Sequence, residues 1–353
     1  MSYLFAILLF SLLIFIHELG HFTAAKAFGI QVNEFSLFMG PPIWKKQIGE
    51  TLYAIRSIPI GGYCAMEGED GGSDHPRAFA KTAWWKRLIV LLAGAFMNFL
   101  IGVALLAVFF APGKQFIMPE IGSVEENCGF RGEYGIQEGD RLYSLDGERI
   151  YIYTDFSLIM SLNGGDFHDL EVIRNGEKIT LQNLNMAKRE FRNEDGSTSL
   201  RYGFSFSLKD ATFTEKVKYT WDSTRDIVRL VRLSLQMLFS GKAGVKDVSG
   251  PVGIVQEMAQ VAKDSSSRRD AFYNLIYFGG FIAINLAVMN LLPIPALDGG
   301  RVVGLLLTTA VEAVTGRRVN PRIEGYIHGA GMVLLLALMG VVMFKDILFA
   351  FMR

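Results

Sequence analysis

Four long apolar stretches constrain this 353-residue chain more than any other feature of its sequence. They cover residues 3–25, 88–111, 271–297 and 325–344. A helix needs about 20 mostly apolar residues to cross the hydrocarbon core of a bilayer. The whole chain is 50% hydrophobic and 12% aromatic, which is more apolar than a typical soluble protein. The sequence therefore predicts a polytopic α-helical membrane protein with four transmembrane helices.

Charge and cysteine content exclude two other classes of protein. The chain has 35 Lys and Arg against 35 Asp and Glu, so its formal net charge is zero. It therefore lacks the long-range attraction expected of a nucleic-acid-binding protein. Cys64 and Cys128 are too few for a disulfide scaffold and form no CxxC motif. We expect the lipid bilayer, and no nucleic acid, among the partners.

Basic residues predict the orientation, because positively charged loops tend to remain cytoplasmic. Seven lie between the first two spans and four follow the third: Lys45, Lys46, Arg56, Arg77, Lys81, Lys86 and Arg87, then Arg301, Arg317, Arg318 and Arg322. Both regions should be cytoplasmic, with the two termini and residues 112–270 extracytoplasmic. The first span has no basic segment before it, so we expect it to be retained and not cleaved as a signal peptide.

Two segments between the spans favour β-structure. Extended runs broken by Gly and Pro in residues 31–66 indicate a membrane-associated β-sheet, although a loop rich in β-formers remains the simpler alternative. Residues 115–208 are polar, with short apolar alternations, and YGIQEGDRLYSLDGERI at 134–150 resembles the PDZ signature. The alternative is a generic small β domain. Residues 225–239 predict an amphipathic helix that lies in the outer headgroup layer or packs on this domain.

The first span contains the pattern HELGH, from His17 to His21. Residues four apart on a helix share a face about 6 Å apart along the axis, so both imidazoles can bind one metal ion. Glu18 can then act as general base without being a ligand. Two core histidines held by hydrogen bonds are the alternative. A charged group at a helix centre costs about 2.5–3.5 kcal/mol on insertion scales, which favours a functional site.

A catalytic zinc ion held by two histidines needs a third protein ligand. The third span ends in NLLPIPALDGG, residues 290–300, in which Asp298 is the first ionisable group after 27 uncharged residues. Pro293 and Pro295 break the helix there, which membrane proteins tolerate where the irregular backbone is buried or lines a cavity. Asp298 is therefore the predicted third ligand, and a helix N-cap is the alternative.

These motifs together resemble the site-two class of intramembrane zinc metalloproteases, in the RseP-like branch with a single PDZ domain. The resemblance rests on HELGH, on the NxxPIPxLDGG run and on the PDZ-like insert, and it covers nearly the whole chain. AGAFMNF at 93–99 is similar to the family's AGPxxNF, with Ala95 in place of Pro. The stretches 61–63 and 249–254 also match the family.

The resemblance implies a Zn2+-dependent endopeptidase of a bacterial inner or plasma membrane that carries out regulated intramembrane proteolysis. Its substrates would be pre-trimmed single-span membrane proteins of the anti-sigma factor or remnant signal peptide type. Zinc would be held by His17, His21 and Asp298, with Glu18 as catalytic base. The edge at Gly61, Gly62 and Tyr63 would bind substrate as an added strand. Asn98 would hold the substrate backbone or pack the spans together.

Two other functions fit part of the pattern. His17, Glu18, His21 and Asp298 could form the relay of a proton- or ion-coupled carrier, although this does not explain the zinc-ligand spacing or the absence of a repeated half. A juxtamembrane peptidase acting on soluble proteins is the other alternative, but apolar residues flank HELGH on both sides.

The predicted organisation is therefore four transmembrane helices, a membrane-associated β-sheet and an inserted, mainly β, PDZ-like domain. Its segments are residues 1–28 (first span with HExxH), 29–87 (cytoplasmic loop with the sheet), 88–111 (second span), 115–208 (PDZ-like domain), 209–270 (linker with amphipathic helix), 271–300 (third span with the LDG motif), 301–324 (cytoplasmic segment) and 325–353 (fourth span and C-terminus).

Overall fold

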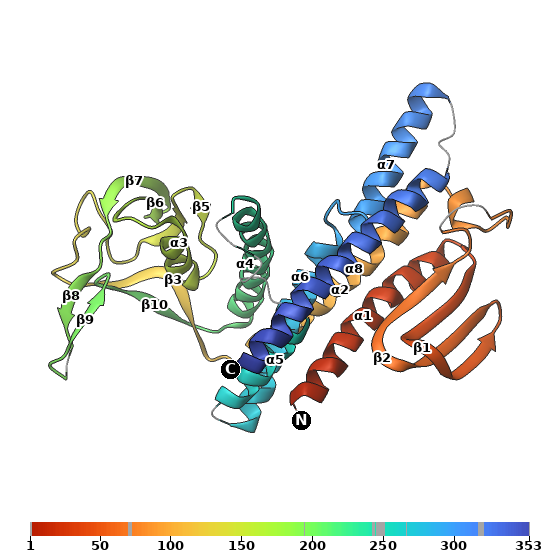
Figure 1. Cartoon of the computed structure of the whole chain (residues 1–353). Coiled ribbons are helices and arrows are strands. Elements are labelled where there is room, and N and C mark those ends of the chain that lie inside the picture. Colours follow the sequence, from red (N-terminus) through yellow and green to blue (C-terminus); the bar gives the residue numbers. More distant parts are fainter. Residues whose placement is uncertain are drawn as a thin grey trace. The chain divides into compact units, whose positions relative to one another are not determined.

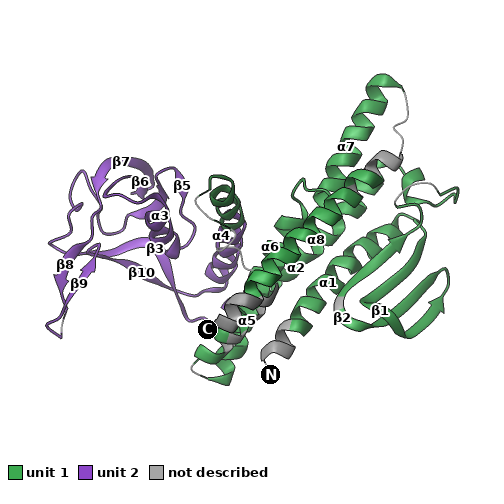
Figure 2. Cartoon of the chain, in the orientation of Figure 1, with its two compact units in different colours: residues 1–109, 230–353 green, residues 110–229 purple. Residues whose placement is uncertain are grey.

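The computed structural model describes residues 2–69, 73–193, 195–241, 244, 251–265, 267–316 and 321–352 (Figure 1). Four residues used in the sequence argument lie outside these ranges: Ser249, Gly250, Arg317 and Arg318. The chain divides into two compact units (Figure 2). Unit 1 comprises residues 1–109 and 230–353, and unit 2 comprises residues 110–229.

Among the described residues, four helices of unit 1 are long and apolar enough to cross a membrane. They are α1 (Ser2–Ala27), α2 (Trp84–Phe110), α6 (Arg268–Asn290) and α8 (Pro321–Met352). This confirms the prediction of a multi-pass membrane protein with four candidate spans.

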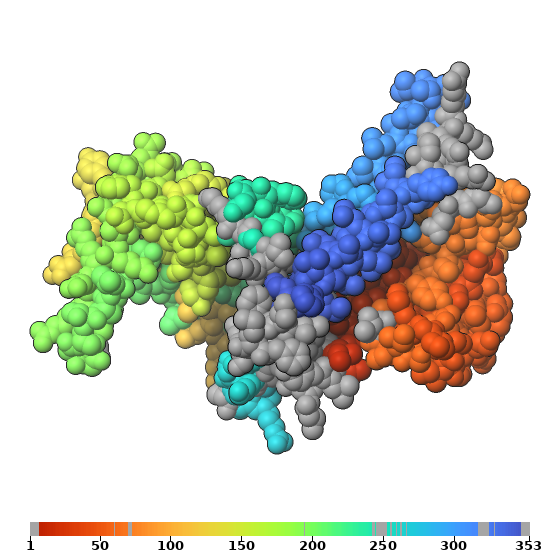
Figure 3. Space-filling view, viewed as in Figure 1, coloured from red at the N-terminus to blue at the C-terminus, as the bar shows by residue number. Residues whose placement is uncertain are grey.

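The membrane helices expose much apolar surface, as helices in contact with lipid do. In α8 only 12% of the most apolar window is buried, and Val333 and Leu334 are 69% and 70% exposed. Figure 3 shows α8, in dark blue, lying along the visible face of unit 1. Three further long helices lie outside these spans: α4 (Phe213–Phe239), α5 (Pro251–Asp264) and α7 (Asp298–Thr315).

Two long strands, β1 (Val32–Ile48) and β2 (Thr51–Met66), form an antiparallel sheet that lies against α1 (Figure 1). Both strands bend, so that residues 34–37 pair with 52–55 on one side and with 62–65 on the other. Residues 42–48 pair with 51–56 beyond them. The sheet therefore has segment 62–65 at one edge. Phe35 packs on Phe15 and Phe22 of α1, and a short 3-10 helix, η1 (Phe79–Lys81), follows the sheet.

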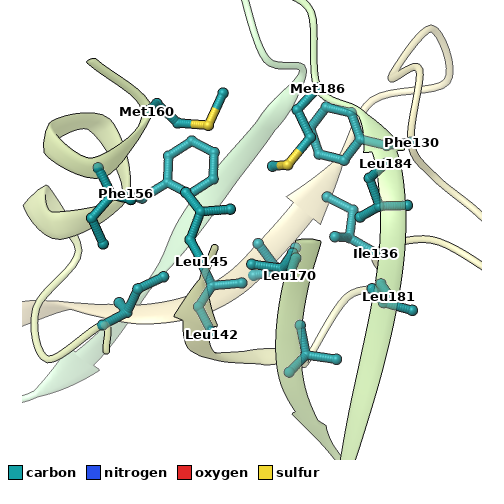
Figure 4. Close-up of a cluster of buried hydrophobic side chains, with 14 of the residues drawn as sticks. Phe130, Ile136, Leu142, Leu145, Phe156, Met160, Leu170, Leu181, Leu184 and Met186 are labelled. Atoms are coloured by element: carbon teal, nitrogen blue, oxygen red, sulfur yellow. The ribbon is translucent and has the colours of Figure 1, made fainter. Parts of the chain in front are cut away.

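Unit 2 is mainly β and has its own core. Its main sheet has the strand order β10-β3-β4-β6-β7, with β5 paired to β4, and β8 and β9 form a separate hairpin. The strands are β3 (Gln115–Val124), β4 (Arg141–Leu145), β5 (Glu148–Arg149), β6 (Phe167–Arg174), β7 (Glu177–Asn185), β8 (Arg189–Arg192), β9 (Thr198–Arg201) and β10 (Phe204–Asp210). Phe156 of α3 (Thr154–Asn163) packs with Leu145, Leu170 and Met186 (Figure 4). Cys128 is also buried in this core.

The first half of α4 belongs to unit 2 and packs on it through polar groups. Arg229 forms an ion pair with Asp155 of α3 at 2.7 Å and a second with Asp226, and it also lies over the ring of Tyr151. The structure thus extends the helix expected at 225–239 back to residue 213, and Phe213 and Trp221 on it remain exposed. The sequence predicted that this helix lies in the outer headgroup layer or packs on the β domain. The contacts of Arg229 show packing on unit 2 at this position.

Candidate metal centre

Helix α1 brings two imidazoles together inside unit 1. His17 and His21 are 9% and 7% exposed, and their Nε2 atoms lie 3.1 Å apart. The spacing of one helical turn places both rings on the same face of α1. Gly20 lets α2 approach this turn closely, because a Cβ on it would lie 2.4 Å from the Ala93 carbonyl oxygen.

A break between α6 and α7 brings the third group to the histidines. Leu291–Leu297 is not regular helix, and Ala296 adopts a positive φ of 76°, which is strained for a residue with a Cβ. The segment folds onto the start of α7 so tightly that a Cβ on Gly299 would lie 2.3 Å from the Leu291 carbonyl. Asp298 is the first residue of α7 and points back toward α1.

Three donor atoms meet at this point. Asp298 Oδ2 lies 3.1 Å from His17 Nε2 and 3.4 Å from His21 Nε2. Zinc bonds of about 2.0–2.2 Å in tetrahedral geometry place neighbouring ligand atoms about 3.4 Å apart, which these distances approach. Asp298 Oδ2 is buried and accepts no hydrogen bond of acceptable geometry in the described part of the chain. The donor set, its spacing and this unsatisfied oxygen all fit a divalent zinc ion.

A second layer of groups surrounds the imidazoles. His21 Nδ1 lies 2.8 Å from the Val90 carbonyl oxygen of α2. His17 Nδ1 lies 3.4 Å from the amide nitrogens of both Asn98 and Asn290. Such partners set which ring nitrogen faces a metal and in which direction.

A cavity of about 420 Å³ opens beside the three donor atoms. Its wall includes Glu18 together with Tyr63 and Cys64 from the sheet edge. Glu18 is thus placed in the same cavity as the predicted ligands. Gly62 lies behind it, because a Cβ on Gly62 would lie 3.7 Å from Glu18 Cγ, whereas Gly61 faces Met39. Asn98 is 1% exposed and lies behind His17, outside the cavity wall.

Three polar residues that the sequence did not single out as site residues also line the cavity: Glu69, Asn290 and Arg301. Arg301 forms an ion pair with Glu69, which joins α7 to the segment after β2. Asn290 is the first residue of the motif that contains Asp298, and Arg301 lies about one helical turn after Asp298. The spacing from Asp298 could therefore have indicated both residues. Glu69 had no such signal, because the pair joins positions far apart in the sequence.

Comparison with known proteins agrees with this chemistry. The profile of Peptidase family M50 matches residues 5–338. A provisionally named zinc metalloprotease of Clostridium acetobutylicum is 36% identical over 347 residues, covering 98% of this chain and 96% of the relative. The regulator of sigma-W protease RasP of Bacillus subtilis is 28% identical over 423 residues, and the zinc metalloprotease RasP of Bacillus licheniformis is 27% identical over 423 residues; each match covers 97% of both chains.

Proposed function

This chain belongs to peptidase family M50 and is a multi-pass membrane zinc metalloprotease, and from this premise we propose that it cleaves peptide bonds within transmembrane segments of single-span membrane proteins. The observation that carries the proposal is the meeting of His17, His21 and Asp298 beside a cavity in the membrane unit. Family membership confirms the sequence-based prediction of a zinc protease, and the comparisons do not favour the carrier alternative.

We assign the zinc ligands to His17, His21 and Asp298. Zinc, when bound, acts as a Lewis acid and makes water a stronger nucleophile near neutral pH. Glu18 accepts a proton from the attacking water and later delivers it to the leaving amine. The position of Glu18 in the wall of the same cavity as the proposed ligands supports this role.

The chemistry of a helix requires an extended substrate. The peptide bonds of a helix are held in its own backbone hydrogen bonds, so a substrate helix has to unwind locally before one of these bonds can be attacked at Glu18. Segment 62–65 lies at the edge of the sheet and contributes Tyr63, Cys64 and Ala65 to the cavity wall. The substrate backbone would pair with this edge near Gly61, Gly62 and Tyr63.

The mainly β unit 2 would act as a PDZ-like filter on the outer side. In this proposal both termini and residues 115–208 face the extracytoplasmic side, and only substrates already shortened there enter the cavity. One relative is named a regulator of sigma-W protease, so anti-sigma factors are one proposed type of substrate. Remnant signal peptides are the other.

The experiment is quantitative membrane proteomics of the native host carrying Glu18→Gln. This change preserves the shape of the side chain and the proposed zinc ligands but removes the base. Truncated single-span proteins should accumulate in the variant and identify the substrates. Glu177→Gln, at an exposed position in unit 2, is the matched control and should leave the membrane proteome unchanged. If no protein accumulates while a proton or ion gradient changes, the cluster is a relay and the proposal fails.

A further inference from the structure

The two histidines of the site differ in what holds their second ring nitrogen. A neutral imidazole that binds a metal through Nε2 carries its proton on Nδ1, and this N–H needs an acceptor. His21 Nδ1 has one, because the Val90 carbonyl oxygen lies 2.8 Å away. His17 Nδ1 instead faces two side-chain amides, Asn98 and Asn290, each with its nitrogen at 3.4 Å. An amide nitrogen donates hydrogen bonds and cannot accept this proton.

Asn98 contains the acceptor that His17 lacks. Its Oδ1 atom is buried and forms no hydrogen bond within the described part of the chain. Half a turn of the amide about its last side-chain bond exchanges Oδ1 and Nδ2, so the oxygen then faces His17 Nδ1. Leaving a buried carbonyl oxygen without a hydrogen bond is destabilising, and this rotation gives it a donor.

Position separates Asn98 from Asn290. Asn98 is 1% exposed and is not among the residues lining the cavity, whereas Asn290 is partly exposed and lines it. Asn98 also lies one turn after Gly94, where α2 contacts both imidazoles: a Cβ on Gly94 would lie 2.3 Å from His21 Nε2 and 2.7 Å from His17 Cε1. The α2 wall that supplies the Val90 carbonyl to His21 therefore supplies Asn98 to His17.

We propose that Asn98 is a positioning residue for zinc, whose side-chain carbonyl accepts the Nδ1–H of His17 and holds Nε2 toward the metal. The inference rests on the ligand set of the proposed function. It differs from both roles that the sequence left open for Asn98, substrate binding and helix packing. In this proposal Asn98 increases zinc affinity, whereas Asn290 is the asparagine that lines the cavity.

The test measures zinc affinity of the purified full-length protein in detergent, by competition with a chromophoric chelator. Asn98→Leu keeps the approximate size of the side chain and removes the acceptor, and it should weaken zinc binding about 10–100-fold. Asn98→Asp keeps an acceptor oxygen and should bind zinc at least as tightly as the parent. Asn285→Leu is the matched control, because Asn285 on α6 donates to the Phe281 carbonyl, and its replacement should leave zinc affinity unchanged.

The outcomes separate the possible roles. One zinc ion per chain at saturating zinc in Asn98→Leu would show that this variant remains folded. Unchanged zinc affinity in Asn98→Leu would overturn the proposal and leave Asn98 a packing or substrate-binding residue. Equal weakening in Asn98→Leu and Asn98→Asp would also overturn it, since aspartate keeps an oxygen that can accept the Nδ1–H of His17. If Asp298→Ala retains the zinc affinity of the parent, the ligand set of the proposed function fails instead.

Discussion

Gly94 illustrates how single residues determine this site. Both imidazoles lie against its Cα, in the space that any side chain would occupy. Gly94 itself has no titratable or ligating group, yet the position of the imidazole nitrogens depends on its lack of a Cβ. A small residue on α2 therefore helps to determine where the two imidazoles of α1 lie.

Gly94→Ala should abolish most activity without unfolding the protein. Its Cβ would displace His21 Nε2 from 2.3 Å to a normal contact, a shift of about 1 Å, and misplacement of this size costs roughly 100-fold in catalysis. Cleavage of a tagged single-span substrate and bound zinc per chain are the measurements. Gly340→Ala on α8 is the control, since nothing lies within 4 Å of a Cβ there. Equal activity in the two variants would contradict this account.

At the residue scale the sequence identified the chemistry but not its surroundings. HELGH specified a pair of imidazoles and a base, and the charge-free span before Asp298 singled out one carboxylate. The roles of these residues remain predictions, although the structure places them together. The ion pair between Glu69 and Arg301 could not be predicted, because it depends on how the sheet and α7 meet. Asn98 was selected, but its contact with His17 could not be read from a one-dimensional pattern.

At the scale of single elements, the side chains of Asp226, Arg229 and Asp155 form an ionisable junction between α4 and α3. The pKa of Asp226 is raised to about 7, mainly by burial and further by the nearby Asp155 carboxylate, while Arg229 opposes both effects. An unfolded aspartate titrates near pH 3.9, so the folded junction binds a proton more tightly between about pH 4 and pH 7. Its contribution to stability is therefore largest at acidic pH and is lost as the pH rises through this window.

Asp226→Asn should remove this pH dependence. Hydrogen exchange of peptides covering residues 213–239, corrected for intrinsic rates, should be faster at pH 8 than at pH 5.5 in the parent and nearly equal in the variant. Asp166→Asn, at an exposed position before β6, should behave like the parent. A pH dependence that survives in Asp226→Asn would assign the titration to another group.

Elements were predicted better in type than in extent. Periodicity indicated a helix at 225–239, but α4 begins at 213. The first half of α4 was not predicted because charged residues interrupt its apolar pattern. Short extended runs were expected in residues 31–66, whereas two strands of 17 and 16 residues bend and pair on both sides. Neither propensity nor alternation encodes such a bend, which depends on tertiary packing against α1.

At the scale of the whole molecule, the separate cores of the two units suggest that unit 2 can be shortened without loss of the metal centre. The four candidate spans and the zinc protease family were predictable, since hydropathy and HExxH spacing act over short windows. The PDZ-like character of residues 115–208 remains a prediction. The described part of residues 115–208 forms eight strands and the single helix α3, and this mainly β composition agrees with it.

Deletion of residues 115–208 should permit cleavage of substrates that keep their outer domain. The parent should cleave only the shortened form of a tagged single-span protein, and the deletion variant should cleave both forms, as measured by the cleaved fraction on co-expression. The same deletion combined with Glu18→Gln should cleave neither and controls for other proteases. Unchanged selectivity in the deletion variant would remove the filter from the proposed function.

The two cysteines of the chain are both buried, Cys64 in β2 of unit 1 and Cys128 in the core of unit 2. Each unit therefore carries one native thiol, and neither needs to be introduced. The rate at which Cys128 reacts with a thiol reagent reports how often the core of unit 2 opens, and the rate for Cys64 reports access to the cavity that it lines. Peptide mass spectrometry of the labelled protein can thus follow access to the cavity and the opening of the β unit in one sample.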